Sequence, residues 1–226
     1  MKDKEYQHKN TYAEKILIAV SYILRLLILV EAATAAWNKN LLLVVLSLGV
    51  LILTFLPSFF ERNYKINLPI EFEFLVVMFI FFSLFLGEQQ GFYLKIWWWD
   101  AFLHAISSLL LAFVGFLIPY ILYTGQKIKT KPKFIALFSF CFALAIGAVW
   151  EIVEFTLDST LGWHMQKSGL VDTMWDLIVD STTAFVISVS GYFYLKRKTL
   201  TGFFDLFLTR FLEKNPQLFR RSKKRI

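Results

Sequence analysis

Three short segments of this chain combine apolar and charged residues: 97–108 (WWWDAFLHAISS), 150–158 (WEIVEFTLD) and 172–181 (DTMWDLIVDS). Each places ionisable side chains within strongly apolar sequence. Such residues are costly inside membrane helices, and they usually mark a functional site. We therefore expect the three segments to lie in membrane helices that share one site.

The composition is that of a membrane protein. Of 226 residues 57% are hydrophobic and 25 are Phe, against roughly 45–50% apolar residues in soluble domains. The single cysteine, Cys141, excludes a disulfide framework and a multi-cysteine zinc site. The net charge of +7 follows the pattern of membrane topology, so we expect no nucleic-acid partner.

The predicted fold class is all-α, a polytopic membrane protein with six transmembrane helices and a C-terminal amphipathic interfacial helix. No apolar stretch shows sustained two-residue alternation, which argues against a barrel. No small-residue cleavage site follows the first stretch, so we predict a retained helix rather than a signal peptide. The transmembrane domain covers 1–198, with helices at about 12–36, 41–57, 69–88, 100–124, 133–157 and 176–195.

The basic residues predict the topology. With a cytoplasmic N-terminus, 20 Lys and Arg fall on the inner side, and three lie outside, at Lys39, Lys95 and Lys167. This bias places both termini in the cytoplasm. Arg25 lies within the first helix, where we expect a structural pair with a carboxylate or carbonyl of another helix.

The tail, residues 199–226, is predicted to be a basic amphipathic segment on the cytoplasmic face. Phe residues recur at helical spacing from Phe203 to Phe211, with Arg210 and Lys214 between them. This pattern is typical of a helix that lies in the membrane interface, with membrane lipids as its partners.

The charged residues of the last three helices fall at one depth. His104, Glu151 and Asp180 each lie four to six residues from an outer helix end, roughly 6–9 Å below the surface. Residues three or four apart share a helix face. We therefore expect one outward-facing cluster, made of Asp100, His104, Glu151, Glu154, Asp176 and Asp180.

Several further residues are secondary candidates for this cluster. His164 lies in the outer loop, and the remaining ones are acidic residues near the same level: Glu31, Glu88, Asp158 and Asp172. Ser107, Ser108 and Ser181 lie close enough in sequence for a serine nucleophile to be considered, although serine in membrane helices commonly serves packing.

So many carboxylates cannot all ionise side by side without a counter-charge. A divalent cation, shared protons, or ion pairs with Arg25 and lysines would each solve this. For a metal, Asp100, His104, Glu151, Asp176 and Asp180 are the ligands we predict, and Glu154 is the general base. Zn, Mn, Mg and Ca are not distinguishable from these residue types.

The motifs also resemble a known family. Trp99-Asp100-x-x-x-His104, Trp150-Glu151-x-x-Glu154 and the late Asp172/Asp176/Asp180 run resemble the YjdF-type bacterial inner-membrane proteins. More distantly they are similar to the VanZ-like family, which has Gln at the Glu154 position and Asn at the Asp180 position. The resemblance implies a membrane topology and a site, without implying a reaction.

Three functions are compatible with these residues. The first is a metal-dependent hydrolase or transferase acting on a lipid or lipid-linked envelope substrate. The second is a cation or proton transporter or channel, and the third is a non-catalytic structural protein. The inner halves of the last three helices lack acidic residues, which favours a one-sided site. The sequence does not determine the oligomeric state.

Overall fold

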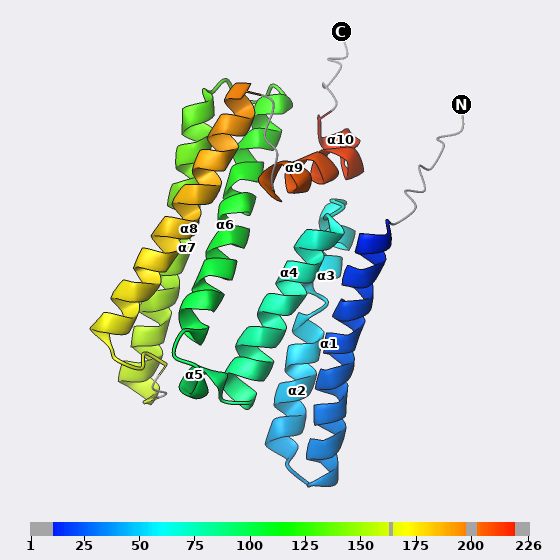
Figure 1. The fold of residues 1–226 in the computed structure, drawn as a ribbon, viewed down its shortest axis with the longest axis vertical. Helices are drawn as coiled ribbons and strands as arrows, with labels where there is room; N and C mark the ends of the chain where they lie inside the picture. Colours follow the sequence, from blue (N-terminus) through cyan, green and yellow to red (C-terminus); the bar gives the residue numbers. More distant parts are fainter. Residues whose placement is uncertain (1–10, 163–164, 198–202, 220–226) are drawn as a thin grey trace. The chain divides into compact units, whose positions relative to one another are not determined.

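The computed structural model describes residues 11–162, 165–197 and 203–219 (Figure 1). Within these ranges every regular element is helical, which confirms the all-α class. The elements are α1 (Tyr12–Trp37), α2 (Leu41–Leu53), α3 (Leu56–Tyr64), α4 (Ile70–Ile80), η1 (Phe81–Gln89), α5 (Phe92–Lys95), α6 (Trp99–Thr124), α7 (Pro132–Leu161), α8 (Leu170–Arg197), α9 (Phe203–Lys214) and α10 (Pro216–Phe219).

Five spans in the described part of the chain are long and apolar enough to cross a membrane. They are α1, α4 with η1, α6, α7 and α8, and the pair α2 and α3, bent by 40°, makes a sixth if it is one span. The outward faces of α7 and α8 expose large apolar side chains such as Val149, Phe155 and Phe185. A polytopic membrane protein is therefore confirmed, since such faces need lipid around them.

The second span is broken, where the sequence predicts one helix over 41–57. Helix α2 ends at Leu53 because Pro57 has no N–H to donate to that carbonyl and its ring would collide with it. Arg25 of α1 provides a hydrogen-bond donor at the break. Its guanidinium donates to the Thr54 carbonyl at 2.9 Å and to the Thr54 hydroxyl at 3.2 Å. Glu73 lies 3.9 Å from the same guanidinium, which confirms the structural pairing predicted for Arg25.

The chain divides into two compact units, 1–85 and 86–226. In the first, α1 packs against α2 and α4. In the second, α6, α7 and α8 form a bundle in which each helix contacts the other two (Figure 1). The single transmembrane domain over 1–198 stays a prediction.

Small residues let the three helices of the second unit approach closely. Helix α7 buries a residue at every fourth position, at Ile135, Ser139, Ala143, Gly147 and Glu151. Ala143 meets Ala112 of α6 and Ala184 of α8 in the centre of the bundle. We call these three alanines the alanine layer.

Hydroxyl groups flank the alanine layer and tie the helices together. Ser139 donates to the Ala112 carbonyl at 2.6 Å, and Ser188 donates to the Ser139 hydroxyl at 3.0 Å. Small residues and interhelical hydrogen bonds of this kind hold membrane helices together where the hydrophobic effect is absent.

Two helix boundaries near the site differ from those predicted. Helix α7 continues to Leu161 instead of 157, and Gly162 ends it in the left-handed conformation at φ 66°. Helix α8 begins at Leu170 instead of 176, directly after Gly169. The earlier start brings Asp172 onto the first turn of α8, where a carboxylate complements the helix dipole.

The C-terminal amphipathic segment forms α9, but its phenylalanine face packs on protein. Phe204 and Phe207 contact Phe113 of α6, with ring centroids 5.8 and 5.3 Å apart. Phe207 and Phe211 are almost fully buried. This face is covered by an aromatic surface of α6 that the sequence pattern of the tail alone does not reveal, and the position of the helix in the membrane interface stays a prediction. The basic residues 220–226 and the predicted start at 199–202 lie outside the described residues.

Candidate functional site

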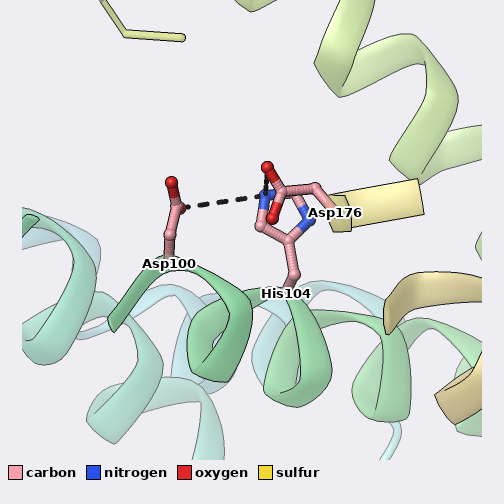
Figure 2. A group of neighbouring side chains, drawn as sticks. All are labelled: Asp100, His104 and Asp176. Carbon is pink, nitrogen blue, oxygen red and sulfur yellow. Dashed lines mark ion pairs between the residues drawn. The ribbon is translucent and has the colours of Figure 1, made fainter. Parts of the chain in front are cut away.

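His104 lies at the centre of the predicted cluster. Its imidazole is 7% exposed, one turn inside the start of α6. Figure 2 shows that Asp100, on the same helix, and Asp176, from α8, approach this ring. Asp100 Oδ1 and Asp176 Oδ2 each lie 4.0 Å from His104 Nε2.

Glu151 brings a third carboxylate to the same ring nitrogen. It comes from α7, is 4% exposed, and its Oε1 lies 3.7 Å from His104 Nε2. Both carboxylate oxygens are buried without a hydrogen-bond partner within the described part of the chain. Helices α6, α7 and α8 thus each direct an acidic residue at one nitrogen atom.

The other ring nitrogen of His104 has a different partner. Asp180 Oδ2 of α8 lies 3.3 Å from His104 Nδ1, within hydrogen-bonding distance. The second oxygen of Asp180, Oδ1, is buried and has no partner among the described residues. Ser108 of α6 fixes the helix at this point by donating to the Asp180 carbonyl at 2.8 Å.

Gly147 makes room for the Asp180 carboxylate. A Cβ at Gly147 would overlap Asp180 Oδ2 and lie 3.2 Å from its Cγ, so any other residue would displace this side chain. The sequence analysis did not single out Gly147. The sequence could have indicated this role, because a glycine four residues before Glu151 lies on the same face of the helix as Glu151.

Lys167 supplies a positive charge that the sequence analysis did not assign to the site. Its Nζ lies 3.1 Å from Asp100 Oδ2. The residue belongs to the connection between α7 and α8, and it is one of the three basic residues predicted to lie on the outer side. The sequence could have indicated this contact, because Lys167 lies between the acidic ends of two predicted helices.

The geometry is suited to a cation. Ligand atoms of Asp100, His104 and Asp176 all lie within 4.8 Å of one another. Two ligands across one ion are at most about 4.2 Å apart, twice a bond of about 2.1 Å. Tetrahedral ligands lie closer, about 3.4 Å apart, so side-chain shifts of up to about an ångström would let these three residues bind one ion.

The remaining predicted residues take other positions. Asp158 accepts hydrogen bonds from the Met165 and Gln166 amides at 2.6 and 2.8 Å, so it holds the loop backbone. Asp172 accepts one from the Lys167 amide at 3.0 Å. Glu154 is partly buried on α7, one turn beyond Glu151.

Three secondary candidates remain. Glu88 is exposed at the end of η1, within electrostatic reach of Asp100 and Lys167. Glu31 lies on α1 in the other unit. His164 lies outside the described residues.

Comparison with known proteins identifies the family. An uncharacterized protein of Thermotoga maritima is 32% identical over 132 residues, which are 56% of this chain and 64% of the relative. This chain thus covers less than two thirds of that relative's length. No solved structure matches. The profile of the family described as "Predicted membrane protein (DUF2238)" matches residues 19–197, which include every residue of the cluster. The chain belongs to this DUF2238 family of predicted membrane proteins.

Proposed function

We propose that this protein is a metal-dependent enzyme of the bacterial cytoplasmic membrane that acts on a lipid or lipid-linked envelope substrate. The observation that carries the proposal is the surroundings of His104 Nε2. Carboxylates from three helices face it, and those of Glu151 lack any hydrogen-bond partner in the described residues.

The energetics of burial support an ion. A buried polar group without a partner costs about 1–3 kcal/mol, and a charged one costs more. Glu151 and Asp180 together leave three such oxygens in the described structure. One divalent cation at Nε2 would satisfy the two Glu151 oxygens, which among the described residues have only the long 3.7 Å contact to His104.

The two nitrogens of His104 support a division of roles. Nε2 would bind the ion together with Asp100, Asp176 and Glu151. Asp180 would instead accept a hydrogen bond from Nδ1–H and orient the ring, as carboxylates commonly do behind metal-bound histidines. We therefore assign Asp180 an orienting role in place of the ligand role that the sequence predicted. A nitrogen ligand among carboxylates favours Zn or Mn over Mg or Ca.

The alanine layer favours an enzyme over a transporter. Ala112, Ala143 and Ala184 are at most 1% exposed, and they fill the bundle on the inner side of the charged residues. A transported ion would need polar groups along a path, and this layer offers none. Glu154, one turn nearer the end of α7, would serve as the general base for a water activated by the ion, in hydrolysis or group transfer.

Topology and resemblance support the cellular setting. The excess of basic residues on one side favours cytoplasmic termini and a site that opens outward. The resemblance to YjdF-type and, more distantly, VanZ-like proteins supports a bacterial envelope membrane.

The test is metal analysis of the detergent-purified full-length protein. We expect about one Zn or Mn per chain, lost in His104→Ala and Glu151→Gln. Asp180→Asn should retain the ion with roughly 10- to 100-fold weaker affinity. Asp158→Asn is the matched control, since this carboxylate holds the loop and should leave the metal content unchanged. Equal metal content in all variants, or none in the wild type, would contradict the proposal.

A further inference from the structure

Lys167 is held in place by its own loop. The Lys167 amide donates to Asp172 Oδ2 at 3.0 Å, and the preceding Gln166 is fixed through its amide to Asp158 and through its side chain to Thr173 at 2.7 Å. The neighbouring backbone is thus bound to the ends of both α7 and α8. This fixes where the lysine side chain begins, so its ammonium group reaches the cluster from a defined position.

The ammonium group lies at the edge of the cluster. Its Nζ is 3.1 Å from Asp100 Oδ2 and 5.1 Å from the centre of the Tyr93 ring. The side chain of Lys167 is 27% exposed, whereas Glu151 and Asp176 are buried. The lysine therefore stands between the buried carboxylates and the surroundings.

Asp100 is shared between this lysine and the proposed ion. Its Oδ1 faces His104, and its Oδ2 faces Lys167. An ion bound at Oδ1 would weaken the hold of Asp100 on the nearby ammonium. A phosphate that touches both the ion and Lys167 would bind between two positive charges, and lysine binds phosphate as a compact point charge.

Tryptophans indicate the depth of the site. Trp150 and Trp175 directly precede Glu151 and Asp176, and they are 48% and 62% exposed on the outer faces of α7 and α8. Exposed tryptophans of membrane helices concentrate at the level of the lipid head groups. Because adjacent helical residues differ in height by about 1.5 Å, the carboxylates lie at that level too.

We infer that the site recognises the phosphate of an anionic lipid head group, and that Lys167 binds the phosphate oxygens beside the ion. This inference rests on the proposed metal site. It adds the substrate class and a residue that determines specificity.

The test measures binding of dihexanoyl phosphatidic acid to the full-length protein in detergent, loaded with Mn²⁺, by titration calorimetry. We expect Lys167→Gln to weaken this binding at least tenfold at unchanged Mn²⁺ content, and Lys167→Arg to restore most of it. Lys95→Gln is the matched control, because this outer lysine is engaged with the Gln90 carbonyl at 2.6 Å and should bind as the wild type does.

The possible failures are distinguishable. A wild type that holds no Mn²⁺ would overturn the metal site itself. A Lys167→Gln protein that holds Mn²⁺ and binds the lipid normally would overturn the inference alone. Inorganic phosphate binding as tightly as the lipid would show that the site takes soluble phosphate, and would overturn the lipid assignment. Equal lipid binding with and without Mn²⁺ would overturn the idea that the ion frees Lys167 to bind the phosphate.

Discussion

The two sides of the His104 ring have unequal surroundings. Nδ1 has one close carboxylate at 3.3 Å, whereas Nε2 faces three carboxylates at 3.7 to 4.0 Å. The closer contact is a hydrogen bond that orients the ring, and the longer ones exceed hydrogen-bonding distance. Under the proposed function, His104 would connect a supporting aspartate to the ion.

Gly147→Ala tests how closely this arrangement is fitted. The added Cβ would displace the Asp180 carboxylate, and with it the Nδ1 contact of His104. We expect the affinity for the ion to fall by roughly 10- to 100-fold, as for other disturbed supporting carboxylates. The measurement is a Zn²⁺ or Mn²⁺ titration of the purified, metal-stripped protein.

Gly49→Ala provides the control for that substitution. Gly49 is also helical, and a Cβ there meets nothing within 4 Å. It should leave ion affinity unchanged and increase stability by about 0.5–1 kcal/mol. Wild-type ion affinity in Gly147→Ala would show that Asp180 is not held by this packing.

Sequence spacing predicted which acidic residues meet, and it missed what supports them. Asp100 and His104 are one turn apart, and counting residues from helix ends placed Glu151 and Asp180 at a similar depth. Lys167 was not assigned to the site because its contact depends on the path of a loop, which no periodicity encodes. Gly147 was missed because it contributes by having no side chain, which leaves room for the Asp180 carboxylate. Only the packing of the helices reveals this.

At the scale of elements, breaks and caps account for the differences from prediction. Hydropathy predicted one helix over 41–57, because it does not take into account that Pro57 has no N–H to donate to the Leu53 carbonyl. It also started the last membrane helix at 176, because Asp172 lowers the local hydropathy although a carboxylate is favoured in a first helical turn.

Phe207→Ala tests the docking of α9 on α6. Phe207 is 1% exposed and contacts Phe113, so its truncation should cost roughly 3–5 kcal/mol of local stability. We expect faster tryptic cleavage after Arg210 in the detergent-purified protein. Leu206→Ala is the control on the same helix, because Leu206 is 42% exposed. Equal cleavage rates in both variants would indicate that α9 is not held by this face.

At the scale of the whole molecule, the charge bias predicts the topology. Single cysteines in place of Lys39 and Lys95, in a Cys141→Ser background, should react with a membrane-impermeant maleimide in intact cells. A cysteine in place of Lys129 should react only after the cells are opened, because positive loops remain in the cytoplasm. The opposite pattern of labelling would reverse the orientation and place the site on the cytoplasmic side.

The alanine layer would also determine how the membrane's electric field acts on the proposed ion. Moving one elementary charge through 100 mV takes about 2.3 kcal/mol, so a divalent ion that crossed the whole field would exchange about 4.6 kcal/mol with it. Tightly packed alanines form an insulator across which the voltage drops, and His104 lies to one side of it. An ion that enters and leaves on that side crosses little of the field. Its occupancy should therefore follow the ion concentration of the adjacent solution and stay constant when the cell depolarises.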